Sequence, residues 1–120
     1  MNGNDIIKRA KEDGVKFISY QFVDVLGAVK SVDAPVKQLE TALENGIWFD
    51  GSSVEGFARI QESDMHLRID PDTYAVLPWS PVEMRRARVF CDIFQTDGSP
   101  FPGDPRGVLK RMVNDLRAQG

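Results

Sequence analysis

Hydrophobic residues occupy every second position in one segment near the start of the chain. Between residues 16 and 23, Ile18, Tyr20 and Phe22 alternate with residues of mixed polarity. This period of two is typical of a β-strand that buries one face. After a short turn, residues 28–32 are predicted to return as the second strand of a hairpin.

Three other segments place apolar residues at the three- and four-residue spacing of an amphipathic helix. A first helix is expected over residues 4–14 with Asn4 or Asp5 as its cap, a second over Pro35–Gly46, and a third after Asp104, which would cap it. The positions expected to face the core are Ile6, Ile7 and Ala10 in the first helix, Val36, Leu39, Ala42 and Leu43 in the second, and Val108, Leu109, Met112, Val113 and Leu116 in the third.

The remaining segments complete an α+β order of elements. Residues 50–64 show no clear period and are predicted to be a loop, whereas residues 67–69, 74–77 and 88–94 are predicted to be strands. Residues 96–105 are rich in glycine and proline and are expected to be a connector. Two strands, a helix and then further strands indicate a sheet with helices packed on one side.

Composition and charge narrow the possible classes of function. The 120 residues are 42% hydrophobic and 28% charged, as in an ordinary globular domain. A net charge of −3 argues against a nucleic-acid partner bound through bulk charge, and no apolar run is long enough to cross a membrane. The N-terminus lacks the pattern of a signal peptide.

The chain has a single cysteine and a single histidine. The cysteine, Cys91, fits a reducing cytoplasm, and it cannot build a usual zinc site with the histidine, His66. Cys91 is expected to be a buried small hydrophobe and His66 a residue at a strand edge.

The most informative part of the chain lies between residues 49 and 67. It reads Phe49-Asp50-Gly51-Ser52-Ser53, then eight further residues, then Glu62-Ser63-Asp64-Met65-His66-Leu67. Taken alone, the first five residues are typical of a turn, because Asp-Gly pairs and serines are common there. A carboxylate in such a loop also favours a cation held against it. The residue types leave both interpretations of Asp50 open.

The full string resembles the N-terminal signature of glutamine synthetases of the bacterial type I class. Residues 22–27 are similar to the first hairpin of that family, and residues 91–93 and 104–106 are similar to its last strand and the start of its last helix. The resemblance implies that residues 1–120 form the N-terminal β-grasp domain, an α+β domain with a mixed sheet of about five strands and helices packed on one side. It also implies that the catalytic C-terminal domain is absent from this chain.

The resemblance further implies a role for three residues. A glutamine synthetase phosphorylates the side-chain carboxylate of glutamate with ATP, and ammonia then displaces the phosphate. In this family the loop that carries Asp50 reaches the active site of a neighbouring subunit, where the aspartate binds ammonium and assists its loss of a proton. Ser53 would add a hydrogen-bond acceptor there. Arg59 would take part in feedback inhibition by glutamine, whereas without the resemblance it is read as a solvated arginine.

The same resemblance sets the expected cofactors and partners. ATP and Mg or Mn would bind the large C-terminal domain of the full-length enzyme, and no cofactor is expected in this domain. Glu62 and Asp64 are interpreted as structural loop acids rather than metal ligands. The expected partners are the C-terminal catalytic domains of the same and neighbouring subunits in a homo-oligomeric ring, a dodecamer. The isolated chain is expected to be inactive and to expose apolar surface near Phe57 and Trp79.

Two alternatives remain open from the sequence. The chain could be a stand-alone, non-catalytic β-grasp module used for interaction. It could also belong to a related ligase that joins glutamate to an amine other than ammonia.

Overall fold

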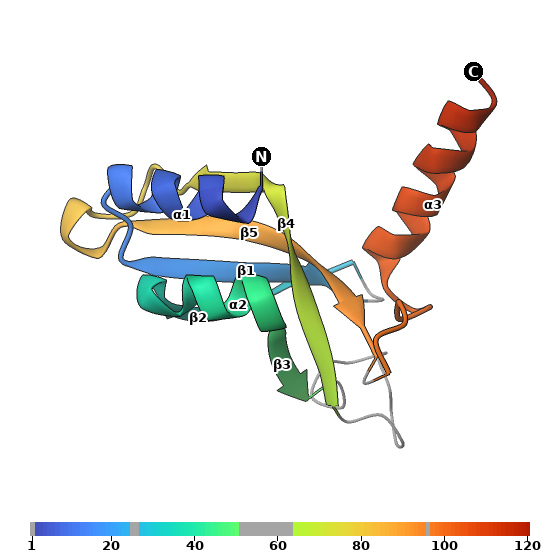
Figure 1. Cartoon of the computed structure of the whole chain (residues 1–120), viewed down its shortest axis with the longest axis horizontal. Coiled ribbons are helices and arrows are strands. Elements are labelled where there is room, and N and C mark those ends of the chain that lie inside the picture. Colours follow the sequence, from blue (N-terminus) through green and yellow to red (C-terminus); the bar gives the residue numbers. More distant parts are fainter. Residues whose placement is uncertain (1, 25–26, 51–63, 96) are drawn as a thin grey trace.

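The computed structural model describes residues 2–24, 27–50, 64–95 and 97–120, with the backbone alone described at residues 49, 50 and 64. In chain order the elements are α1 (Gly3–Glu12), β1 (Phe17–Val23), β2 (Val29–Pro35), α2 (Leu39–Asn45), β3 (Ile47–Asp50), β4 (Asp64–Val76), β5 (Arg86–Phe94) and α3 (Pro105–Ala118) (Figure 1). Single turns of 3-10 helix, Val36–Gln38 and Val82–Met84, precede α2 and β5.

The strands form one mixed sheet with the order β2-β1-β5-β4-β3. The central pair, β1 and β5, is parallel, and the other three pairs are antiparallel. The expected hairpin is present, with Tyr20 of β1 opposite Val32 of β2. The α+β class and the mixed sheet of five strands are therefore confirmed. β3 lies at one edge, where β4 is its sole neighbour among the described strands.

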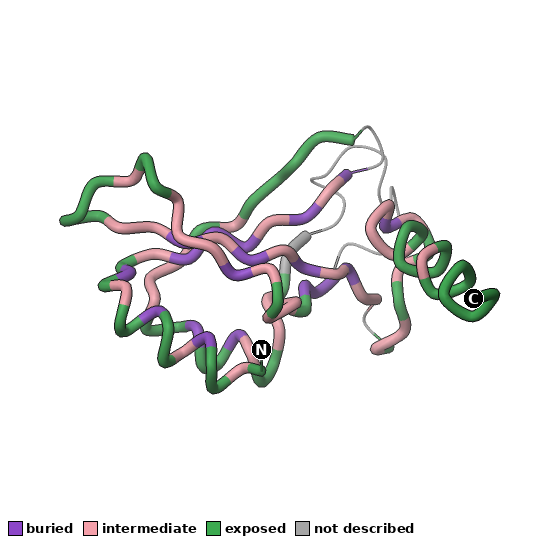
Figure 2. The backbone as a smooth tube through the Cα atoms, turned by 90° about the horizontal axis from the view of Figure 1, so that it is seen from above, coloured by how far each residue is buried: buried purple, intermediate pink, exposed green. Residues whose placement is uncertain are grey.

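The helices α1 and α2 pack on the same face of this sheet (Figures 1 and 2). Alternate residues of β5 are buried against them, as the strand pattern requires. The predicted core positions of both helices are buried or partly buried. The buried core consists of Ile6, Ala10, Val15, Ile18, Tyr20, Phe22, Leu39, Ala42, Met65, Leu67, Tyr74, Ala87, Val89, Cys91 and Ile93.

Local features set the start of α1 and the end of α2. α1 begins earlier than predicted, because Asn2 is its cap and forms a reciprocal capping box with Asp5. Gly46 ends α2 with a φ of 73°. A Cβ atom at Gly46 would lie 2.7 Å from the Leu67 carbonyl oxygen. Only glycine therefore allows the chain to turn from α2 directly into β3 beside β4.

The strand prediction was wrong at two places. Residues 47–50 form β3, although the loop was predicted to begin at residue 50 and no strand was expected before it. The predicted strands 67–69 and 74–77 join into the long strand β4, whose register shifts between Asp70 and Ala75. Thr73 bridges this irregularity, because its hydroxyl donates to the Asp70 carbonyl and accepts from the Phe90 amide, both at 2.7 Å.

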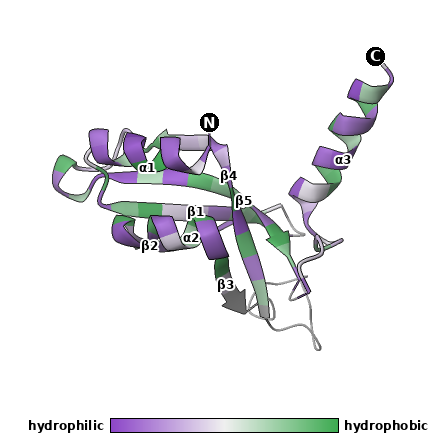
Figure 3. Ribbon diagram, in the orientation of Figure 1, coloured by the Kyte–Doolittle hydropathy of each residue, from purple (hydrophilic) through white to green (hydrophobic). Residues whose placement is uncertain are grey.

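The third helix departs from the expected packing. Asp104 caps α3 as predicted, but the helix points away from the sheet (Figure 1). Its apolar stripe is exposed rather than internal, with Val108, Leu109, Met112 and Leu116 between 49% and 62% exposed. Figure 3 shows hydrophobic and hydrophilic positions interleaved along this free helix. The period identified an apolar face correctly, but a period does not specify what covers that face.

Candidate functional site

The candidate site begins where β3 ends. Asp50 is the last residue of β3 and lies opposite Asp64, the first residue of β4. The two strands thus bring together both ends of the segment that carries the sequence signature. Ser53 and Arg59 lie outside the described residues, as do Phe57 and Glu62. Their expected roles, and that of the Asp50 side chain, remain predictions.

A cluster of rings and one arginine supports the base of this segment. His66 of β4 pairs with Trp48 of β3 on one side and with Phe94 of β5 on the other. The His66 ring centroid lies 4.9 Å from that of Trp48 and 5.8 Å from that of Phe94, to which it is nearly parallel. The Arg68 guanidinium lies 4.0 Å from the centre of the Phe94 ring. We refer to Trp48, His66, Arg68 and Phe94 as the His66 cluster.

His66 is buried, and its surroundings favour the neutral form of its imidazole ring. Only 7% of His66 is exposed. Its Nε2 accepts a hydrogen bond from Arg68 Nε at 3.3 Å, whereas its buried Nδ1 has no partner among the described residues. Burial and the neighbouring Arg68 guanidinium lower the pKa of His66 below 6.5. The prediction of an edge residue was wrong, because β3, which was not expected from the sequence, covers this side of β4.

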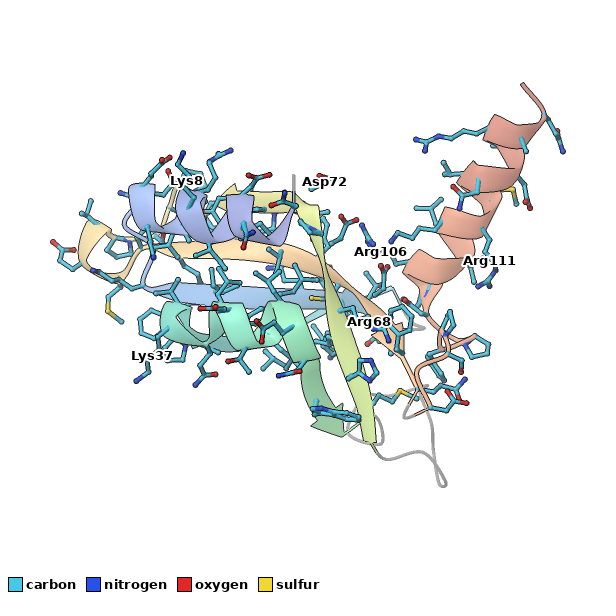
Figure 4. All side chains as sticks on the ribbon, in the orientation of Figure 1. Lys8, Lys37, Arg68, Asp72, Arg106 and Arg111 are labelled. Carbon is cyan, nitrogen blue, oxygen red and sulfur yellow. The ribbon has the colours of Figure 1, made fainter. Side chains whose placement is uncertain are left out.

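A second group of charges fixes the start of α3 on the sheet. Arg106 donates to Asp92 of β5 at 2.6 Å and to Asp70 of β4 at 2.7 Å, and Lys110 donates to Asp92 at 2.6 Å. Figure 4 shows Arg106 between the first turn of α3 and the sheet. Although partial burial acts against it, the Arg106 hydrogen bond lowers the pKa of Asp70. We refer to Asp70, Asp92, Arg106 and Lys110 as the α3 anchor.

Asp104 completes this connection through the backbone. One carboxylate oxygen accepts from the Ile93 amide at 3.0 Å and the other from the Arg106 amide at 3.1 Å. The residue is 2% exposed, and burial raises its pKa despite these two hydrogen bonds. A single side chain therefore joins β5 to the first turn of α3.

The remaining chemistry of the described residues is limited. No group of three or more His, Cys, Asp or Glu side chains that could hold a metal ion occurs among them. Cys91 is buried, as predicted, and burial raises the pKa of its thiol to about 12, so it is unreactive as a nucleophile. An apolar hollow of about 340 Å³ lies between α3 and the hairpin, with Val29, Phe90 and Leu109 among its lining residues. None of the described helices is long and apolar enough to cross a membrane.

Comparison with known proteins places this domain in a family. The model of the glutamine synthetase β-grasp domain matches residues 14–96. A glutamine synthetase of Staphylococcus epidermidis is 50% identical over 98% of the chain, and one of Staphylococcus aureus is 49% identical over the same share. The chain spans 26% of the length of each of these relatives.

Solved structures agree on the fold. A structure of a GmaS–ADP complex superposes with a TM-score of 0.85 at 26% identity, and it matches 96% of this chain and 26% of its own. A glutamine synthetase of Plasmodium falciparum superposes with a TM-score of 0.87 over 99% of this chain and 23% of its own. At 21% identity, that second likeness supports the fold alone. The family-model match and the close bacterial relatives together establish that this chain belongs to the glutamine synthetase β-grasp domain family.

Proposed function

We propose that residues 1–120 are the N-terminal β-grasp domain of a glutamine synthetase that ligates ammonia to glutamate at the expense of ATP. The near-complete alignment with two staphylococcal glutamine synthetases, at 49% and 50% identity, supports this assignment. Because the chain spans 26% of their length, the catalytic domain would be supplied by the remainder of a longer enzyme. That enzyme would act in the cytoplasm as a homo-oligomeric ring of twelve subunits, without nucleic-acid or membrane partners.

Asp50 is the residue through which this domain would enter the reaction. The observation that carries the proposal is the place of its backbone at the end of β3, an edge strand among the described strands. In the active site of the neighbouring subunit, the carboxylate would bind ammonium by charge. Ser53 would accept a further hydrogen bond from the same cation, and Arg59 would contribute to feedback regulation by glutamine.

The chemical step explains why a carboxylate is useful there. Transfer of the ATP γ-phosphate to the glutamate side chain produces an acyl phosphate, and neutral ammonia must then attack its carbonyl carbon. Ammonium therefore has to lose a proton after it binds, and a nearby carboxylate can assist that transfer. Binding is the larger part of the role, because a carboxylate is a weak base.

The ATP and metal sites would lie outside this domain. Among the described residues, no acidic or histidine cluster fits a divalent metal. Such ions would bind in the catalytic domain and neutralise the phosphate charge there. The exposed apolar stripe of α3 and the hollow beside it are suited to packing against that domain. Such packing would account for the exposed apolar stripe of α3.

Both alternatives from the sequence stay distinguishable from this proposal. If the natural protein were a stand-alone module, its full-length form would have no ligase activity. A ligase for another amine would prefer that amine to ammonium in a direct competition. The relatives at 49% and 50% identity are glutamine synthetases, and this favours ammonia as the substrate.

Ammonium kinetics of Asp50 variants test the proposed role. In the full-length enzyme, Asp50→Asn keeps the side-chain shape but loses its charge, so the KM for ammonium should rise. Loss of a charge-assisted contact of roughly 1.5–3 kcal/mol corresponds to about one to two powers of ten. Asp50→Ala should behave similarly, and Asp50→Glu should recover part of the affinity. The KM values for glutamate and ATP serve as internal controls and should change much less.

An aspartate that merely formed a turn would give a different result. Asparagine serves the same turns well, so Asp50→Asn would then be nearly silent. An unchanged ammonium KM in a folded, assembled Asp50→Asn enzyme would rule out the role of Asp50 in ammonium binding.

A further inference from the structure

Among the described strands, the edge strand that carries Asp50 pairs with β4 alone. β3 has four residues, and each pairs in register with a residue of β4. Trp48, two residues before Asp50, lies opposite His66. Cross-strand pairs fix the position of an edge strand. The contact between Trp48 and His66 therefore helps to set the position of the last residues of β3.

His66 has a defined ring orientation because three neighbours surround it. Trp48 covers one side of the ring and Phe94 stacks nearly parallel to the other, at an interplanar angle of 13°. Arg68 Nε donates to His66 Nε2, which requires that nitrogen to be unprotonated. The neutral ring therefore carries its hydrogen on Nδ1. A buried ring with one tautomer, one stacked neighbour and one tilted neighbour is a rigid support.

The His66 cluster is also connected to β5 and to α3. Arg68 pairs in register with Asp92 of β5, and Asp92 is bound by Arg106 and Lys110 of α3. The His66 cluster and the α3 anchor thus lie side by side on the sheet face opposite α1 and α2. The contacts of the His66 cluster therefore connect β3 through β4 to β5, in the centre of the sheet.

We propose that His66 is a positioning residue for Asp50: held between Trp48 and Phe94 and hydrogen-bonded by Arg68, it fixes the end of β3 from which Asp50 is presented. This inference rests on the proposed role of Asp50 in binding ammonium. His66 does not touch the substrate. It acts through the orientation of β3, so its removal misplaces Asp50 without altering the sites for glutamate or ATP.

Full-length variants test this inference through the KM for each substrate. His66→Ala removes the ring and the acceptor, and it should raise the ammonium KM about five- to tenfold, because small misplacements weaken a positioned contact. The KM values for glutamate and ATP should stay near their original values. His66→Phe keeps the ring and should recover part of the loss, which also provides a folded variant if alanine disturbs folding.

A matched pair of arginines separates the cluster from its surroundings. Arg68 covers the Phe94 ring and Arg88 covers the Phe90 ring in a similar way, at 4.0 and 4.2 Å. Arg68→Ala should raise the ammonium KM in the same direction as His66→Ala. Arg88→Ala removes an equivalent contact away from β3 and should leave the ammonium KM unchanged.

A double-mutant cycle decides whether His66 acts through Asp50. In an Asp50→Asn background, His66→Ala should add no further rise in the ammonium KM, because the contact to be positioned is already lost. An equal rise in both backgrounds would overturn the inference, as would an unchanged KM in a folded His66→Ala enzyme. If Asp50→Asn alone left the ammonium KM unchanged, the proposed function would fail first, and the positioning role would fail with it.

Discussion

Asp104 is a buried residue that joins β5 to the start of α3. It accepts one hydrogen bond from β5 and caps α3 with the other. Asp104→Ala should lower the free energy of unfolding by about 2–4 kcal/mol, because it removes a helix cap and leaves the buried Ile93 amide unpaired. Chemical denaturation of this chain and of the variant measures the difference.

Asp115 provides the control for that substitution. It lies on the same helix and is exposed, so Asp115→Ala should change the free energy of unfolding by less than about 0.5 kcal/mol. Equal effects of the two alanine variants would contradict the role of Asp104 as a buried cap that joins β5 to α3.

His66 makes stability depend on pH in a defined direction. Its pKa is lowered below 6.5 in the folded chain, so the unfolded chain binds a proton more readily below that pH. The stability contribution of neutral His66 is complete above pH 6.5 and is lost as the pH falls from 6.5 towards the lower folded-state pKa. Arg68 on β4 opposes protonation, and the nearest β5 carboxylate, Asp92, is already bound by Arg106 and Lys110.

His66→Phe isolates this contribution from other titrating groups. The free energy of unfolding of the original chain should fall more steeply between pH 7 and pH 5 than that of the variant. Urea denaturation at both pH values provides the comparison. Parallel pH profiles would contradict a buried, neutral His66.

Residue-level expectations succeeded where local sequence determines the environment. The Asp104 cap and the burial of Cys91 were both predicted, because a capping residue and an apolar strand are local features. His66 was misjudged because its burial depends on a strand that comes from another part of the chain. The roles expected for Asp50, Ser53 and Arg59 remain predictions.

At the scale of elements, patterns predicted the type of structure better than its continuity. The β1–β2 hairpin and α2 agree with the expected periods. β3 was missed because its apolar residues follow one another without alternation. β4 was divided because Pro71 and its acidic neighbours resemble a turn, whereas the strand absorbs them in a bulge closed by Thr73.

The exposed stripe of α3 predicts weak self-association of the 120-residue chain. Met112 and Leu116, 57% and 60% exposed, lie on one side of a helix that contacts the sheet mainly near its first turn. Association should bury this apolar surface and should therefore be reduced by Met112→Glu. Sedimentation at increasing protein concentration measures the effect.

Asn114 supplies a matched control on the same helix. It is exposed and polar, so Asn114→Glu introduces the same charge without removing apolar surface. Association should persist in that variant. A clean monomer of the unaltered chain at high concentration would contradict this account of α3, and with it one reason to expect a covering domain.

At the scale of the whole molecule, the family could be recognised from the sequence because the signature between residues 49 and 67 is specific in residue type and spacing. The exposed state of α3 could not be foreseen, since helical periodicity records an apolar face and not its partner. Trp79, expected near exposed apolar surface, is 78% exposed. We predict that the chain alone has no ligase activity, because the proposed catalytic domain would come from the remainder of a longer enzyme.

The most direct test of the account asks whether Asp50 serves a neighbouring subunit. One full-length variant carries Asp50→Asn, and a second has an intact Asp50 but a disabled catalytic domain. Each is nearly inactive alone at low ammonium concentration. After dissociation and joint reassembly in equal amounts, about a quarter of the sites would combine an intact catalytic domain with an intact neighbouring Asp50. The account predicts that glutamine formation returns to about that fraction of the unaltered enzyme's rate. Mixed oligomers that remain inactive would contradict it, because they would place Asp50 in the site of its own subunit.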